Sequence, residues 1–306
     1  MTEPQFGGTY DQLLAAAKAA EKAGLVSFAR SDHIYWEREP AAAALDAFTS
    51  IGGLARDTKD IRLCVMVTPV TFRHPSMILK AATTASAMSD GRFDLGVGTG
   101  WNEFEHRAFG LDFPDWTERF ARLEDALRYI RAGLSGESYT GTHYSIEADS
   151  LPRPERMPLI VGGSGKERTP RLAARYADEY NHFIALASEI GPKVQLLREA
   201  AAELGRSNGD VLISVMGPAH VRPSREEYEQ ALSTTAASRG MQPSALQERW
   251  DSIGVPCGTP EDAAPVISAL RQAGVDRYYL QWVDITDTTG LEANIAAMKE
   301  TISLAS

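Results

Sequence analysis

Apolar and polar residues follow two different periods along this chain, and the two periods alternate from the N-terminus to the C-terminus. Apolar residues at every third or fourth position indicate amphipathic helices. These segments are 10–24, 45–58, 75–89, 117–134, 167–177, 189–205, 260–273 and 291–303. Short and nearly continuous apolar runs lie between them, as is typical of strands buried on both faces of a parallel sheet. These runs are 25–33, 61–70, 92–98, 157–163, 178–184, 210–217 and 275–283.

This order of elements predicts an α/β fold in which helices surround a parallel sheet. A (β/α)8 TIM barrel fits the seven predicted strands and the chain length best, and an open doubly wound sheet is the alternative. The eighth strand belongs before residue 10, where 1–9 are polar and rich in glycine. We therefore expect a shortened or missing first strand, or a native start upstream of Met1. In the second case an upstream extension would make the protein more stable.

We expect the whole chain, 1–306, to form a single TIM-barrel domain. Two segments interrupt the alternation of strands and helices. The first is a polar, hairpin-like insert at 136–150, and the second is a charged, helical stretch within 219–257. The second interruption predicts an insertion before the last strand–helix unit.

Composition and charge exclude several classes of function. The formal net charge of −10 argues against a nucleic-acid partner, because such proteins present basic surfaces. We expect no membrane partner and a cytoplasmic location, since no apolar run reaches ~18 residues and the first residues do not form a leader peptide. Cys64 and Cys257 are isolated, so no disulfide framework is expected. The histidines are scattered singly without an H-E-x-x-H pattern, so we expect no metal site.

The stretch RFDLGVGTGWNE, residues 92–103, places glycines at 96, 98 and 100 directly after an apolar run. It is not a dinucleotide fingerprint, because Trp101 stands where the third glycine of G-x-G-x-x-G belongs. The later VGGSGKE is not a P-loop, because Glu167 follows the lysine. Glycines in a strand also mark a bulge or close packing against a neighbour, and that interpretation stays open.

Four segments of the chain, taken together and in order, resemble the bacterial luciferase-like superfamily. They are AAKAAEKAGLVSFARSDH, LCVMVTPVTFRHP, SDGRFDLGVGTGWNEFEHRAFG and PLIVGGSGKERTPRLAARYAD. More closely, the chain is similar to oxidoreductases of that superfamily that use the deazaflavin coenzyme F420. FMN users share the same barrel, so an FMN-dependent luciferase-like monooxygenase is the alternative. A non-catalytic flavin-binding barrel is a second alternative.

The resemblance implies that the loops after the fourth and fifth barrel strands hold the phosphate side of the coenzyme. Glycine suits this role, because backbone N–H groups without a neighbouring Cβ can approach phosphate oxygens. The resemblance also implies a non-proline cis peptide near Val65–Met66, behind the coenzyme ring. The implied coenzyme-binding residues are Asp32, Val65, Met66, Thr68, Gly98, Thr99, Gly100, Trp101, Asn102, Gly162, Gly163 and Ser164.

The predicted catalytic residues are His33, Glu103 and Trp36. His33 ends the second barrel strand and suits a general acid or base, because its ordinary pKa lies near the working pH. Asp32 would orient His33 or bind the coenzyme ring, although a strand-end Asp–His pair can also simply cap a loop. Glu103 is a candidate proton donor, and a glutamate there also favours the start of a helix. Trp36 would form a wall of the pocket or stabilise a reacting intermediate.

The resemblance implies hydride transfer between C5 of the deazaflavin and a small organic substrate. The reaction expected first is reduction of an activated C=C or C=N bond. By the same resemblance, 219–257 would cover the substrate site, and the protein would form a homodimer.

Overall fold

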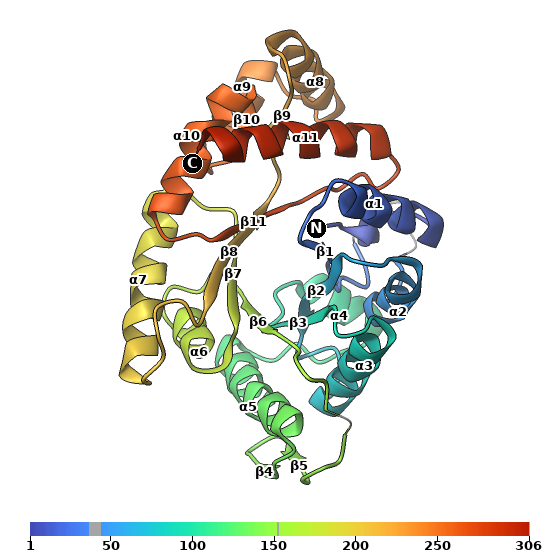
Figure 1. The fold of residues 1–306 in the computed structure, drawn as a ribbon, viewed down its shortest axis with the longest axis vertical. Coiled ribbons are helices and arrows are strands. Elements are labelled where there is room, and N and C mark those ends of the chain that lie inside the picture. Colours follow the sequence, from blue (N-terminus) through green and yellow to red (C-terminus); the bar gives the residue numbers. More distant parts are fainter. Residues whose placement is uncertain (37–43, 152, 306) are drawn as a thin grey trace.

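Seven parallel strands curve into a nearly closed barrel at the centre of the structure, and helices surround it (Figure 1). The computed structural model describes residues 1–36, 44–151 and 153–305. Along the barrel the order of strands is β1-β2-β3-β6-β7-β8-β11. These strands are β1 (Ser27–Arg30), β2 (Arg62–Pro69), β3 (Phe93–Gly98), β6 (Leu159–Gly162), β7 (Glu179–Phe183), β8 (Leu212–Gly217) and β11 (Arg277–Leu280).

The helices follow the strands in the predicted alternation. They are α1 (Tyr10–Lys22), α2 (Ala47–Asp57), α3 (Pro75–Met88), α5 (Trp116–Ser135), α6 (Arg168–Tyr176), α7 (Ala187–Glu203), α10 (Pro260–Gln272) and α11 (Thr288–Leu304). A short 3-10 helix, η1 (Pro4–Phe6), precedes α1. The sequence pattern missed α4 (Glu103–Phe109), because seven residues are too few to show a helical period.

A single residue stands where a first barrel strand would pair with its two neighbours. Thr2 forms parallel bridges with Arg30 at the end of β1 and with Trp282 beyond β11. Its N–H donates to the Ala29 carbonyl at 2.8 Å, and the Trp282 N–H donates to the Met1 carbonyl at 2.7 Å. The N-terminus accordingly lies between β1 and β11 in Figure 1. The predicted barrel with a shortened first strand is confirmed.

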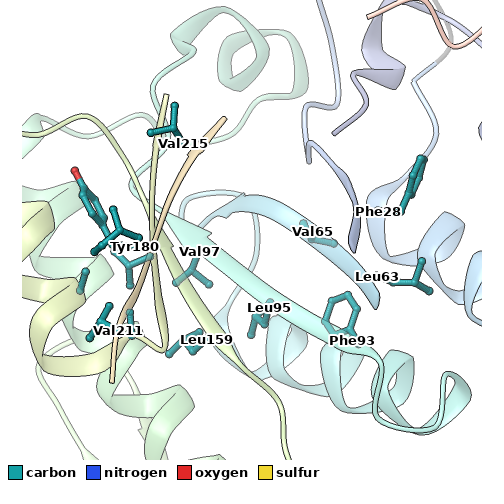
Figure 2. Packing of buried hydrophobic residues seen from close by; sticks show 14 of the residues in the cluster. Phe28, Leu63, Val65, Phe93, Leu95, Val97, Leu159, Tyr180, Val211 and Val215 are labelled. Atoms are coloured by element: carbon teal, nitrogen blue, oxygen red, sulfur yellow. The ribbon is translucent and has the colours of Figure 1, made fainter. Parts of the chain in front are cut away.

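The largest hydrophobic core lies between the strands and the surrounding helices. Residues that point outward from the strands, such as Phe28, Leu63, Phe93, Leu95 and Leu159, pack there (Figure 2). Because side chains alternate along a strand, the residues between them point into the barrel. The outward side chains pack against the helices, and the inward side chains fill the inside of the barrel.

The inside of the barrel is closed at the N-terminal ends of the strands by ion pairs. Arg62 donates from Nε to Asp94 at 3.1 Å, and Arg277 donates from Nη1 to Glu179 at 2.7 Å. Above them lies a small apolar cluster of Met1, Ala29, Cys64, Met66, Ile160 and Tyr279. Since these side chains fill the lower part, an open site is left only at the C-terminal ends of the strands.

The two predicted interruptions are present. Residues 136–150 contain a two-stranded antiparallel hairpin of β4 (Tyr139–Thr140) and β5 (Ser145–Ile146). The segment 219–257 contains β9 (His220–Val221), α8 (Arg225–Ser238), α9 (Pro243–Ser252) and the start of β10 (Cys257–Gly258). Its helices pack around Trp250 in a second, smaller core that also includes Ile184 after β7. The assignment of 1–306 to one domain stays a prediction.

Within the described ranges, no helix has both the length and the apolar character needed to cross a membrane.

Candidate active site

A cavity of about 770 Å³ opens at the C-terminal ends of the strands. Its walls come from the N-terminal segment, the loop after β1, the loops after β3 and β6, and the start of α5. Its floor includes Met66 of β2 and Met216 of β8. This is the end of a barrel where loops from many strands meet, and it is the place where TIM-barrel active sites are built.

His33 lines this cavity and is held by a carboxylate from another element. Its Nδ1 donates to Glu105 Oε1 at 2.9 Å, and the second Glu105 oxygen accepts the Ile34 N–H at 3.2 Å. The Glu105 side chain is only 2% exposed. Because Glu105 occupies Nδ1, Nε2 is the ring nitrogen available to a ligand. Glu105 is a site residue that could not be recognised from the sequence pattern.

The surroundings of His33 favour its protonated form. Burial alone would lower the pKa of His33, but the hydrogen bond to Glu105 and the negative charges of Glu105, Glu3 and Asp32 outweigh burial. The pKa of His33 is therefore raised above its ordinary value. An imidazolium at this position can give a proton to a substrate held in the cavity.

Glu103, the predicted proton donor, is exposed on the first turn of α4 and does not line the cavity. The physical reason is the phase of the helix. Each residue advances an α-helix by about 100°, so a side chain two positions later points to nearly the opposite side. Glu105 therefore faces the barrel where Glu103 faces solvent, and this placement does not support the predicted role of Glu103.

Asp32 also lines the cavity, but its partner is an arginine and not His33. Arg73 binds both Asp32 oxygens, with one contact from Nη2 at 3.1 Å, and reaches Asp46 at 2.8 Å. Burial raises the pKa of Asp32, and the charge of Arg73 opposes that shift. Glu105, and not Asp32, is hydrogen-bonded to His33, and a role of Asp32 at the coenzyme ring stays a prediction.

Aromatic rings surround His33. Its ring centroid lies 5.9 Å from that of Trp36 and 5.6 Å from that of Trp101, in both cases edge-on. Phe6 contacts Trp36 at 5.1 Å, also edge-on. Trp36 and Trp101 thus both line the cavity, as predicted, and place His33 within an apolar wall.

The glycines of the motif after β3 are close to another part of the barrel. A Cβ on Gly98 would lie 2.8 Å from Val67 Cγ2, and one on Gly162 would lie 2.7 Å from Val67 Cγ1. The Val67 side chain therefore occupies the space between β3 and β6, next to a shift in strand register between Val65 and Thr68. The Met66–Val67 peptide is cis, one position beyond the predicted one. Close packing thus explains these glycines, and the same two glycines also line the cavity.

The loop after β6 is rich in glycine and lies beside a lysine side chain. Gly162, Gly163 and Ser164 line the cavity as predicted. The N-cap residue of α6, Glu167, makes no side-chain cap hydrogen bond, and α6 lies outside the described lining of the cavity. Lys193 of α7 donates to the Ser164 carbonyl at 3.2 Å. This side of the cavity suits an anion.

Lys193 lies beside a neutral histidine, and burial lowers the pKa of Lys193. Its Nζ lies 2.6 Å from His182 Nε2. Burial and the charge of Lys193 lower the pKa of His182 to about 4, so the imidazole accepts the hydrogen bond in its neutral form. Sequence reasoning missed Lys193, because its position in a long helix does not reveal the loop that it reaches.

The other predicted site residues fall into two groups. Met66, Thr99 and Gly100 line the cavity. Val65 is buried in the outer core, Thr68 is buried beside Arg73, and Asn102 caps α4 by accepting the Phe104 N–H at 3.1 Å. Val65, Thr68 and Asn102 are absent from the lining, because the strand alternation or the helix cap directs them elsewhere. The roles of all these residues in binding a coenzyme stay predictions.

The part of the chain with described coordinates places no three His, Cys, Asp or Glu side chains together to hold a metal ion. None of the described lining residues comes from 219–257, and its predicted place over the substrate stays a prediction.

Comparison with known families matches residues 2–277 to the model described as luciferase-like monooxygenase. The chain belongs to the luciferase-like monooxygenase family. The predicted superfamily is thereby confirmed. Among solved structures, a monooxygenase from Streptomyces bottropensis has the same fold, with a TM-score of 0.80 and 20% identity over 96% of this chain and 92% of that one.

Curated members of related sequence carry a more specific name. A Microbacterium testaceum protein named F420-dependent glucose-6-phosphate dehydrogenase is 34% identical over 214 residues, which are 68% of this chain and 62% of that protein. A Beutenbergia cavernae protein of the same name is 35% identical over 206 residues, which are 65% and 61% of the two chains. This luciferase-like chain spans about three fifths of the length of these relatives.

Proposed function

We propose that this protein is a coenzyme F420-dependent oxidoreductase that transfers a hydride between C5 of the deazaflavin and a small organic substrate. The proposed reaction is reduction of an activated C=C or C=N bond. The observation that carries the proposal is the His33–Glu105 pair, which places a proton donor inside a cavity whose opposite side suits an anion. The names of the relatives support the choice of coenzyme.

The residues present fit this coenzyme. Gly98 and Gly162 keep the cavity wall free of side chains at positions where a Cβ would meet Val67. The loop at Ser164 and the ammonium group of Lys193 would hold the phosphate side. When bound, coenzyme F420 supplies a two-electron hydride carrier that reacts poorly with oxygen.

His33 is the proton donor in this proposal. Glu105 fixes its Nδ1, so the proton leaves from Nε2 toward the substrate. The raised pKa of His33 keeps the imidazolium populated, which suits a reduction that consumes a proton. Addition of a hydride and a proton across the double bond completes the two-electron reduction.

The remaining lining residues position the reactants and exclude water. Met66 and Met216 form an apolar floor, and Trp36 and Trp101 enclose the side at His33. Holding two reactants in a dry cavity lowers the entropic cost of bringing them together. The protein thus supplies orientation and one proton, while the coenzyme carries the electrons.

Anaerobic oxidation of reduced F420 in the presence of enones and cyclic imines tests this proposal. We expect turnover with at least one of these compounds and a loss of about 100-fold in His33→Ala, the lower end of the usual contribution of general acid catalysis. Oxygen consumption with reduced FMN, without turnover of F420, would instead make the protein an FMN-dependent monooxygenase. A cytoplasmic location and a homodimer remain part of the proposal.

A further inference from the structure

The two sides of the cavity differ in charge. Behind the glycine-rich side, Lys193 donates to the Ser164 carbonyl without lining the cavity itself. On the opposite side are the His33–Glu105 pair and Glu3 of the N-terminal segment. A coenzyme with an anionic side therefore has one favourable orientation, and its substrate meets the other side.

Carboxylates predominate on the substrate side. Glu3 is buried, and its two oxygens accept hydrogen bonds from the neutral amides of Gln5 and Gln281, each at 2.7 Å. Burial lowers the pKa of the Met1 amino group to about 6, so it is mostly uncharged at neutral pH. A dianionic phosphate monoester placed here would be repelled by Glu3, while the His33 imidazolium offsets the charge of Glu105.

The cationic group that this side presents is the His33 imidazolium, and Glu105 already pairs with it. Of the cavity-lining residues that the structure describes, none is a lysine or an arginine. Arg73 lies behind Asp32 and is engaged by Asp32 and Asp46. Lys193 serves the glycine-rich side. Arginine and lysine are the side chains that typically bind a phosphate, and the described substrate side offers neither.

Aromatic side chains, and not lysines or arginines, form the entrance of the cavity. Trp101 is 64% exposed, Trp116 49% and Phe183 46%, and all three line the cavity. Trp101 continues inward to Trp36, with ring centroids 6.2 Å apart. Large apolar side chains exposed together at one cavity mark a binding site for a hydrophobic ligand.

We infer that the substrate is an uncharged, hydrophobic α,β-unsaturated carbonyl compound with a ring-shaped body, and not a sugar phosphate such as the one named for the curated relatives. This inference rests on the proposed function, because it assigns the second reactant of the same site. The C=C bond gains a hydride at one carbon from the reduced deazaflavin and a proton at the other from His33. The substrate is reduced by two electrons, and the deazaflavin is oxidised by two.

Binding and turnover are measured separately on the full chain. Tryptophan fluorescence, with and without F420, follows titration with cyclohex-2-enone, a naphthoquinone, glucose and glucose-6-phosphate. Turnover of the same compounds is followed by F420 absorbance in the direction that each compound allows. We expect each neutral ring compound to bind at least 10-fold more tightly than glucose-6-phosphate, and glucose-6-phosphate to give no turnover.

The Trp101→Ala variant identifies the surface responsible. We expect it to weaken binding of the ring compounds about 10-fold when F420 is absent, so that a contribution of Trp101 to coenzyme binding does not enter the comparison. Phe109→Ala is the matched control, because Phe109 is 58% exposed on α4 but lies outside the cavity lining. It is expected to bind and turn over as the parent protein does.

The possible outcomes distinguish the substrate assignment from the coenzyme assignment. Tighter binding of glucose-6-phosphate, or no binding of any ring compound, overturns the substrate assignment while F420 binding upholds the coenzyme. Failure to bind F420 overturns the proposed function, and the substrate assignment with it. An equal loss in Trp101→Ala and Phe109→Ala would show that the entrance does not recognise the substrate.

Discussion

His33 and Glu105 are 72 positions apart in the sequence and 2.9 Å apart in the structure, where Nδ1 of the histidine donates to Oε1 of the glutamate. The loop after β1 carries one partner and the short helix α4 carries the other. Their contact fixes the ring and raises the pKa of His33 despite burial. This pair is the centre of the proposed chemistry.

Replacement of Glu105 by glutamine tests the pair directly. The amide oxygen can still accept from Nδ1, but the negative charge that stabilises the imidazolium is lost. Burial, which lowers the pKa of His33, is then opposed only by the charges of Glu3 and Asp32. The pKa of His33 therefore falls. Reduction requires protonated His33, so the rate decreases as pH rises through this pKa, and we expect that limb of the pH–rate profile to move to lower pH. Steady-state rates of F420H2 oxidation across pH measure the shift.

The control for this change is Glu103→Gln on the solvent side of the same helix. The pH–rate profile of Glu103→Gln should coincide with that of the parent protein. A shift in the Glu103 variant without one in the Glu105 variant would reverse the assignment of the two carboxylates.

The stability of the fold should also depend on His33. A pKa raised in the folded state gives stability that is fully present below the unfolded pKa of about 6.5 and lost as pH rises through the folded pKa. The Glu105→Gln variant should lose this dependence, because its His33 no longer binds the proton more tightly when folded. Urea denaturation at several pH values measures the difference.

Gly162 is predicted to tolerate no larger residue. An alanine Cβ would lie 2.7 Å from Val67 Cγ1, inside a closely packed junction of strands. Overpacking of this kind costs about 1–3 kcal/mol in the free energy of unfolding. We expect Gly162→Ala to show this loss in urea denaturation together with weaker F420 binding. Gly209→Ala is the matched control, since no atom lies within 4 Å of its Cβ, and equal stabilities of the two variants would refute the packing argument.

Lys193 is expected to contribute to coenzyme affinity. Loss of its ammonium in Lys193→Gln removes the positive charge beside Ser164. We expect the Kd for F420 to rise about 10-fold, which corresponds to about 1.4 kcal/mol, and its dependence on salt to weaken. Titrations at low and high ionic strength measure both effects. Lys22→Gln, on the exposed face of α1, should leave them unchanged. Equal Kd values for Lys193→Gln and the parent protein would remove Lys193 from the binding site.

Arg73 pairs with the buried carboxylate of Asp32. Replacement of Arg73 should therefore lower the free energy of unfolding. In Arg73→Gln the Asp32 side chain, 1% exposed, loses its counter-charge. Breaking a buried ion pair by removal of one partner typically costs about 3–5 kcal/mol. The pKa of Asp32 is already raised by burial, so its ionised form opposes folding increasingly as pH rises through that pKa. We therefore expect a larger deficit at pH 7 than at pH 5.

Urea denaturation of Arg73→Gln at the two pH values measures this deficit. The exposed Arg56→Gln change at the end of α2 serves as the control. A deficit that is the same at both pH values would show that the charge on Asp32 is not its cause.

The periodic parts of the fold could be predicted from sequence because they bury many side chains in a regular pattern. The apolar run of β2 and the helical spacing of α1 are examples. The closure of the barrel by Thr2 could not be predicted, since a single bridging residue has no period. The short α4 was missed for the same reason.

Site residues could be predicted from the sequence where a histidine, tryptophan or glycine lies near the end of a predicted strand. His33, Trp36 and the glycines of both loops follow strands directly, and they all line the cavity. Glu105, Arg73 and Lys193 were missed because each acts through a partner from another element. The choice between Glu103 and Glu105 depends on the phase of a helix, and only the structure gives that phase.

Parallel fluorescence titrations of the purified protein with F420 and with FMN test the central claim most directly. We predict tight binding of F420 and binding of FMN that is at least 10-fold weaker. Tighter binding of FMN than of F420 would contradict the account and would assign the protein to oxygen chemistry within the same family.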